Sequence, residues 1–242
     1  MNILILGDIM GPSGREAIIK KLPNLIKQKK IDFVIVNGEN AADPGVGITK
    51  KNTEEFFRAG TDVITTGNHI WDQKETMEFI TSEKRLLRPQ NLFEGSPGKG
   101  FGIFNSKNNK KVAVINLMGN IFMKKCDDVF EAAKTFIQNV KLKENADFIV
   151  VDMHGEITSE KMAMGYLFDG KATMFVGTHT HVPTSDHRIM EKGTAYQTDI
   201  GMCGDYNSVI GMNRENSLKK FFKDPSATKH YPALGEATIS GL

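Results

Sequence analysis

The chain has 242 residues, of which 40% are hydrophobic and 25% charged, and its formal net charge is +2. This length allows a substantial buried core, and no change in composition marks an internal boundary, so we expect a single domain over residues 1–242. Acidic and basic residues are interspersed, which argues against a protein that binds duplex DNA.

The amino terminus and the cysteines predict a cytoplasmic protein. Residues 1–6 lack the charged flank and long apolar run of a signal peptide, and no stretch approaches the length of a membrane-spanning helix. Cys126 and Cys203 are far apart and belong to no Cys-x-x-Cys pair. Such usage is typical of buried, inert thiols in a reducing compartment.

Short apolar runs alternate with helical patterns along the chain. We expect strands at 3–6, 33–36, 62–66, 101–105, 111–116, 148–151, 173–176, 188–190 and 194–198. We expect helices at 14–29, 49–57, 73–80, 127–142, 158–166 and 213–223. This alternation predicts the α/β class: a sheet with helices on both faces and some antiparallel pairing in the later part of the chain.

Two residues refine the expected helices. Pro23 lies inside the first helix and predicts a kink or a split there. Thr49 precedes the second helix and is the predicted cap of its amino terminus.

Polar residues follow five of the apolar strands. They are Asp8; Glu39 and Asn40; Asn68 and His69; His154; and His179 with His181. The carboxyl ends of strands in an open α/β sheet lie along one edge, where ligands bind, so these side chains are expected to meet. Their number exceeds what one tetrahedral ion needs and suits two ions that share a bridging carboxylate. Mixed oxygen and nitrogen donors without thiolate favour manganese, iron or zinc.

The two histidines of Val176-Gly177-Thr178-His179-Thr180-His181 are central to this hypothesis. On an extended strand, residues two positions apart point to the same side, so both imidazoles would converge on one point. Converging imidazoles are typical of a metal site.

Each of these residues also has an ordinary structural explanation. Asp8 and Glu39 could cap helices, Asn40 and Asn68 are common turn residues, and a lone His154 is more often a core or surface group. The repeated placement favours the metal site, because helix caps would not require histidine at four such positions.

Other well-known motifs are absent from the sequence. There is no phosphate-binding G-x-x-x-x-G-K-[ST] loop and no G-x-S-x-G elbow, and Gly45-Val46-Gly47 is too short for a dinucleotide fingerprint. The lysines within 107–111 and 219–223 are interpreted as solvated faces, with contact to RNA left open as an alternative.

The motif set resembles that of the calcineurin-like metallophosphoesterases. Gly67-Asn68-His69 and His154 match their pattern, and the segment 177–181 matches with one inserted residue. Met10 stands where the first motif usually has a second ligand, and Glu39-Asn40 replaces the usual aspartate of the second motif. Both departures, together with Gly-Asn-His-Ile-Trp-Asp, are similar to the YmdB-like branch of this superfamily, over nearly the whole chain.

The resemblance implies a bacterial metalloprotein with a layered α/β/β/α sandwich of mixed sheets, the helices lying on the outer faces. It implies two divalent or mixed-valence transition-metal ions, with iron or manganese ahead of zinc. Glu39 would bridge them, Asp8 and His181 would hold one with Asn40 nearby, and Asn68, His154 and His179 would hold the other.

The implied activity is phosphodiester hydrolysis, with 2′,3′-cyclic nucleotides or similar small diesters as substrates. A metal-bridging hydroxide would attack phosphorus, and His69 would act as general acid, a contribution of ~10²–10⁴-fold. Ile70 occupies the position of an acidic residue that steadies this histidine in the wider superfamily, so Asp72 could do so instead, or could simply cap the next helix. Asp199 could support a ligating histidine or sit in an ordinary turn.

Two other functions remain open from the sequence. One is a metal-containing regulatory protein that acts through a protein or RNA partner. The other is a dinuclear hydrolase of phosphomonoesters or amides. A homo-oligomer is compatible with either, and with the phosphodiesterase.

Overall fold

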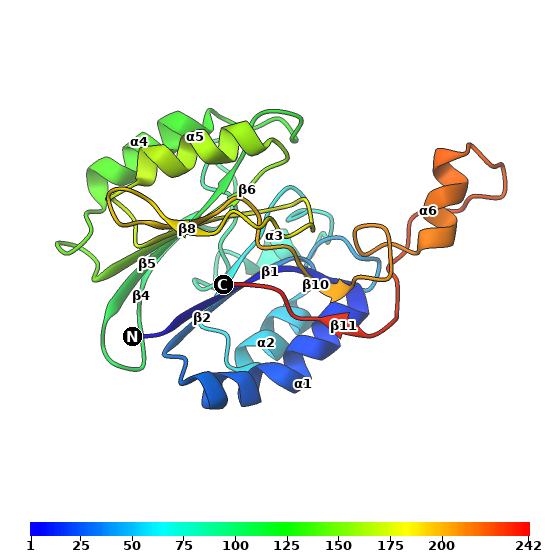
Figure 1. Ribbon diagram of the computed structural model, residues 1–242, viewed down its shortest axis with the longest axis horizontal. Helices are drawn as coiled ribbons and strands as arrows, with labels where there is room; N and C mark the ends of the chain where they lie inside the picture. Colours follow the sequence, from blue (N-terminus) through cyan, green and yellow to red (C-terminus); the bar gives the residue numbers. More distant parts are fainter.

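The computed structural model describes residues 1–242 and contains two β-sheets that pack face to face, with helices on their outer faces (Figure 1). The first sheet has the strand order β11 (Ala237–Thr238), β10 (Met202–Asp205), β1 (Ile3–Met10), β2 (Phe33–Asn40) and β3 (Val63–Thr65). Its strands run parallel except for β11, which is antiparallel to β10.

The second sheet is mixed. Its order is β4 (Phe101–Asn105), β5 (Lys111–Met118), β6 (Phe148–His154), β7 (Met174–Thr178), β9 (Ala195–Gln197) and β8 (Arg188–Ile189). The strands from β5 to β9 are parallel, and β4 and β8 pair antiparallel at the two edges.

The longer helices cover the two outer faces. Helices α1 (Gly11–Lys29) and α2 (Lys50–Ala59) lie on the first sheet, and α4 (Val129–Asn139) and α5 (Thr158–Phe168) on the second (Figure 1). The short α3 (Thr76–Phe79) follows β3, and α6 (Arg214–Phe221) projects from the body. None of the helices combines the length and the hydrophobicity that crossing a membrane requires.

Three layers of buried apolar side chains hold this arrangement together. The middle layer joins Ile5 and Ile35 of the first sheet to Val114 and Val150 of the second. The outer layers lie between each sheet and its own helices. The layered α/β/β/α sandwich expected from the family resemblance is therefore confirmed.

A single sheet with helices on both faces, as the strand and helix pattern alone predicted, is wrong. The continuous apolar run of a strand shows only that both faces are buried. A second sheet buries a face as well as a helix does, so this pattern could not distinguish the two. Strands β10 and β11 were not predicted either, because they are short and lie in a stretch without clear periodicity.

The expected helices formed with changed ends. Helix α1 continues through Pro23 as one helix. Pro23 is exposed, so the carbonyl that loses its amide partner can be hydrated, which explains why no split occurs. Thr49 caps α2, since its side chain accepts from the backbone N–H of Asn52 at 3.1 Å.

Phe136→Ala should lower the free energy of unfolding by ~3–5 kcal/mol, because the ring fills the outer layer beneath α4. Phe136 is 3% exposed, and its ring centroid lies 5.3 Å from that of Phe101 and 6.4 Å from that of Phe168. Denaturant unfolding measures the loss. A change as small as that of a surface substitution, below ~0.5 kcal/mol, would contradict this packing.

Candidate metal centre

The predicted site residues come together where the carboxyl ends of strands from both sheets meet. Asp8 lies in β1, Glu39 and Asn40 end β2, and His154 ends β6. The remaining members follow β3 and β7; they are Asn68, His69, His179 and His181. Because the sheets face each other, donors far apart in sequence lie close together at one edge of the two sheets.

One group of donor atoms is centred on His154 Nε2. This nitrogen lies 2.9 Å from Glu39 Oε1, 3.0 Å from Asn68 Oδ1 and 3.1 Å from His179 Nδ1. Ligands bound at about 2.0–2.2 Å to one ion lie roughly 3 Å from one another. The spacing of these atoms is therefore that of a single ligand shell.

A second group surrounds Asp8, which is fully buried. Its Oδ1 has no hydrogen-bond partner and lies 3.9 Å from His181 Nε2, whereas its Oδ2 accepts from the backbone N–H of His179 at 3.0 Å. A buried carboxylate oxygen without a partner is costly. A cation between Asp8 and His181 would remove that cost.

The hydrogen bonds of His154 aim its lone pair at the first group. The Thr178 hydroxyl donates to Asp152 Oδ1 at 2.7 Å, so it accepts from His154 Nδ1, which lies 3.0 Å away. The proton of the neutral ring therefore sits on Nδ1, and Nε2 is free to ligate.

His181 and His179 are held in the same manner. His181 Nδ1 donates to the carbonyl of Ile210 at 2.7 Å, and His179 Nε2 lies 3.1 Å from Glu156 Oε2. Both partners only accept, so each ring carries its proton on the outer nitrogen and turns the other toward the cluster. Three imidazoles whose lone pairs face inward, beside two buried carboxylates, fit a cation centre.

Asn40 contacts the centre through its amide nitrogen. Nδ2 lies 3.2 Å from Glu39 Oε1 and 3.2 Å from His181 Nε2. An amide nitrogen does not ligate a metal, and a half-turn of the amide group brings Oδ1 to the same place. Asn40 thus lies beside His181, the neighbourhood that the family resemblance implied for it.

The ionisable groups of the centre shift one another's pKa values. Burial alone would lower the pKa of His154. The nearby carboxylates of Glu39, Asp8 and Asp152 outweigh burial and raise this pKa to about 9. Burial raises the pKa of Asp8 to about 6, against the effect of His181 and His154. For Glu39, burial is outweighed by His154 and His69, and the pKa falls to about 2. Without metal, a proton on His154 takes the place that a cation would fill.

Metal affinity should consequently rise with pH. A ligand whose pKa is raised holds its proton at neutral pH, and the metal must displace it, so affinity gains up to ~10-fold per pH unit from His154 below its pKa of about 9. Competition between the protein and a chelator for Mn²⁺, measured at several pH values, tests this. An affinity that does not change with pH, after correction for the chelator, would contradict it.

Removing metal should lower the melting temperature, because the carboxylates of the centre then lose their counter-charge. Metal at a hundred times its Kd stabilises the folded state by ~2.7 kcal/mol when it does not bind the unfolded chain. Thermal unfolding in EDTA and in rising Mn²⁺ measures the shift. Equal melting temperatures in both conditions would contradict a metal centre here.

His179 and His181 do not lie on a strand, contrary to the sequence-based prediction. Strand β7 ends at Thr178, and the backbone of both histidines is left-handed, with φ of 100° and 65°. The two imidazoles converge because the chain turns sharply after β7, and not because side chains alternate along a strand. The metal-ligand role predicted for the two histidines does not depend on their lying in a strand.

His69 lies at the edge of the centre and has a carboxylate partner. Its Nδ1 is 2.6 Å from Asp72 Oδ2, and its backbone N–H donates to Glu39 Oε2 at 3.2 Å. Asp72 does not cap α3, whose cap position is Glu75. Its carboxylate contacts the His69 ring instead. Lys124, which the sequence did not single out, lies 3.1 Å from Asp72 Oδ1.

A buried ion pair that the sequence did not indicate lies behind the centre. Asp199 contacts no ligating histidine side chain; its Oδ2 accepts from Lys161 Nζ at 2.7 Å and from the Thr180 hydroxyl at 2.8 Å. Lys161 lies in the middle of a predicted helix, and its sequence position gave no sign that it is fully buried.

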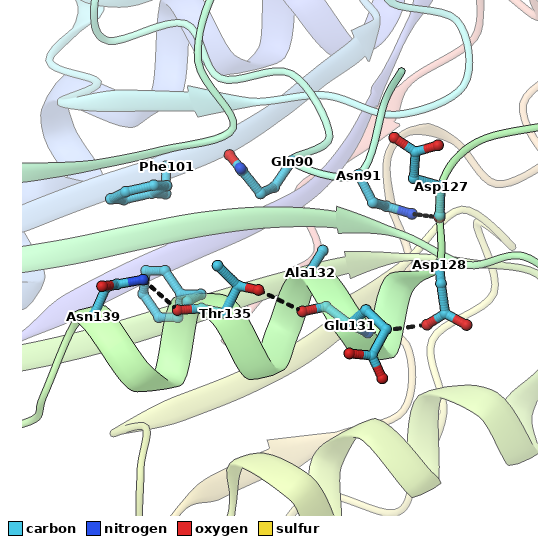
Figure 2. Close-up of a pocket in the computed structure, with 10 residues that line it drawn as sticks. Gln90, Asn91, Phe101, Asp127, Asp128, Glu131, Ala132, Thr135 and Asn139 are labelled. Carbon is cyan, nitrogen blue, oxygen red and sulfur yellow. Dashed lines mark hydrogen bonds between the residues drawn. The ribbon is translucent and has the colours of Figure 1, made fainter. Parts of the chain in front are cut away.

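A separate cavity of about 320 Å³ lies beside α4, and none of the predicted site residues lines it (Figure 2). Its polar groups serve the surrounding backbone. Asp128 Oδ1 accepts from the N–H groups of Phe130 and Glu131, and Asn91 donates to the carbonyl of Asp127. These bonds identify Asp128 as the cap of α4 and Asn91 as a support of the preceding loop, and the Glu131 carboxylate accepts from Lys134 on the same helix.

Comparison with known proteins agrees with this geometry. A family model described as "YmdB-like protein" matches residues 4–242. The chain belongs to the YmdB-like family. It is 44% identical over 242 residues to a Bacillus subtilis (strain 168) protein named "2′,3′-cyclic-nucleotide 2′-phosphodiesterase", covering 100% of this chain and 90% of that protein.

Two solved structures share the fold of this YmdB-like protein. One, from Thermus thermophilus, has a TM-score of 0.89 at 36% identity and covers 100% of this chain and 98% of that one. The other, described as a novel phosphatase of Mycoplasma pneumoniae, has a TM-score of 0.89 at 37% identity and covers 99% and 85%. Membership of this metallophosphoesterase family implies divalent metal ions, and the clustered ligand atoms of Glu39, His154 and His179, within 4.8 Å of one another, are suited to hold one.

Proposed function

We propose that the protein is a dinuclear metal-dependent phosphodiesterase that hydrolyses 2′,3′-cyclic nucleotides. The observation that carries the proposal is the inward-facing donor set, in which the buried Asp8 Oδ1 has no hydrogen-bond partner and lies 3.9 Å from His181 Nε2. The similarity to the Bacillus subtilis phosphodiesterase supports the substrate class. In this proposal the protein works in the cytoplasm.

The residues divide between two ions. Glu39 would be shared by both ions, since one of its oxygens lies 2.9 Å from His154 Nε2 and 3.2 Å from Asn40 Nδ2, which neighbours His181. Asn68, His154 and His179 would hold one ion; Asp8 and His181 would hold the other, with Asn40 beside them. When bound, the ions supply an activated nucleophile and neutralise charge on the phosphoryl oxygens. The mixture of oxygen and nitrogen donors suits manganese, iron or zinc, and the family resemblance favours iron or manganese.

His69 is the proposed general acid. Asp72 engages Nδ1 and fixes the orientation of the ring, which leaves Nε2 as the nitrogen that can protonate the leaving oxygen. The side chain of His69 is 29% exposed, so it can reach a substrate that binds at the edge of the centre. Its N–H bond to Glu39 couples its position to the ligand set.

Incubation of the Mn²⁺-loaded protein with 2′,3′-cyclic AMP tests the proposal. Cleavage of the 2′ ester leaves the phosphate on the 3′ oxygen, so the expected product is adenosine 3′-phosphate, separable from the 2′ isomer by chromatography. The protein treated with EDTA is the control and should be inactive until metal is restored. Bound metal with no hydrolysis of any diester would overturn the proposal.

A phosphomonoesterase is the second candidate, because the related Mycoplasma pneumoniae structure is described as a phosphatase. A monoester carries a third unesterified oxygen where a diester carries its second ester oxygen, so the same centre would have to neutralise more negative charge on a monoester. Comparing kcat/KM for p-nitrophenyl phosphate and bis(p-nitrophenyl) phosphate separates the two activities. A preference for the monoester would favour this second candidate.

A further inference from the structure

We propose that the buried ion pair of Lys161 and Asp199, acting through Thr180, is a positioning device that holds the ligand loop of His179 and His181. This inference rests on the metal-ligand roles proposed above for the two histidines. It assigns a function to residues whose side chains are not among the proposed ligands.

Burial makes this ion pair unusual. Lys161 is 0% exposed and Asp199 is 1% exposed, and their charged atoms lie 2.7 Å apart. Removing two charges from water costs several kcal/mol per ion in a protein, and an apolar pair of similar size is often at least as stable. Stability alone is therefore a weak reason for such a pair, and a specific geometric role explains it better.

Asp199 forms hydrogen bonds with Thr180, the residue between the two histidines. Its Oδ2 accepts from both the hydroxyl and the backbone N–H of Thr180, at 2.8 Å and 3.2 Å. Its Oδ1 accepts from the N–H of Gly201 at 2.9 Å, which ties the loop to the segment that enters β10. Lys161 neutralises the carboxylate and fixes it from the side of α5.

The backbone on either side of Thr180 is strained. His179 and His181 have φ of 100° and 65°, a region that non-glycine residues seldom adopt and that costs of order 1–3 kcal/mol per residue. Such a conformation persists only where the surroundings determine it. The two hydrogen bonds to Thr180 act at the point where both strained residues meet.

Gly177 provides the route for the lysine. A Cβ at this position would lie 2.7 Å from Lys161 Cδ and 1.9 Å from the carbonyl oxygen of Thr198. The carbonyl of Thr198 alone requires glycine at this position, and the missing Cβ also leaves room for the stem of Lys161 on its way to Asp199. The motif and the ion pair form one structural unit.

Two variants test the role without leaving an unpaired buried charge: Thr180→Val, and the double variant Lys161→Met with Asp199→Asn. Binding of Mn²⁺ alone is measured by competition with a chelator, below the temperature at which unfolding begins. Loss of an outer partner of a metal ligand typically weakens binding ~10–100-fold, and we expect this for the double variant and a smaller loss for Thr180→Val. Phe136→Ala is the matched control, since it destabilises a core layer away from the loop and should bind Mn²⁺ as the wild type does.

The outcomes separate this inference from the proposed function. If the wild type binds no Mn²⁺, the proposed function fails. If the wild type binds and both variants bind as tightly, the ion pair only stabilises the fold, and the positioning role is overturned. If Phe136→Ala weakens binding as much as the double variant does, affinity follows stability and the positioning role is again overturned.

Discussion

His69→Ala is expected to lower the turnover of 2′,3′-cyclic AMP by ~10²–10⁴-fold while leaving the metal content unchanged. The imidazole is the only part of His69 that can supply a proton to the leaving oxygen. The hydrogen bond between His69 and the ligand set is made by the backbone N–H, which donates to Glu39 Oε2 at 3.2 Å and is retained by alanine. Steady-state kinetics and elemental analysis of the same preparation measure both effects.

Asp72→Asn is the matched comparison for this variant. The amide keeps an oxygen close to His69 Nδ1 but loses the negative charge that lies 2.6 Å away. We expect a smaller loss of turnover than for His69→Ala, because the proton donor itself remains. Full activity of His69→Ala would refute its role as general acid, and loss of metal would show that it supports the ligands instead.

Glu39→Gln should weaken metal binding by more than the ~10–100-fold that loss of an outer partner of a ligand costs. The change preserves shape and removes a charge that is 1% exposed and 2.9 Å from His154 Nε2. A shared ligand affects both ions, so the variant should lose most of its metal and its activity together. Chelator competition with Mn²⁺ measures the affinity.

Asp43→Asn is the control for that substitution. It makes the same carboxylate-to-amide change a short way along the chain, at a side chain that is 82% exposed and paired with Arg15. Its metal affinity should equal that of the wild type. If Glu39→Gln retains the wild-type affinity, Glu39 is no ligand and the dinuclear assignment is wrong.

The candidate site could be predicted in outline because its residues follow strands. An apolar run that ends in a polar group identifies the carboxyl end of a buried strand, and topology collects such ends at one place. Asp8, Glu39 and His154 were located correctly in this way, although the strands belong to two sheets instead of one. Which sheet a strand joins depends on partners that hydrophobic periodicity does not encode.

The supporting residues could not be predicted, because their roles arise from contacts between distant segments. Ile210 fixes the tautomer of His181 through a backbone carbonyl, so its side chain carries no signal for that function. In the sequence, Lys161 is an ordinary lysine within a helix, and only the packing of α5 brings it to Asp199. The left-handed backbone at His179 could not be predicted either, because histidine favours this conformation much less than glycine does.

Anomalous X-ray scattering from crystals of the Mn²⁺-loaded protein tests the central claim most directly. Two peaks are expected, one among Glu39, Asn68, His154 and His179, and the other among Asp8, Glu39 and His181. No peak at this edge of the sheets, or manganese bound only elsewhere on the chain, would contradict the dinuclear centre.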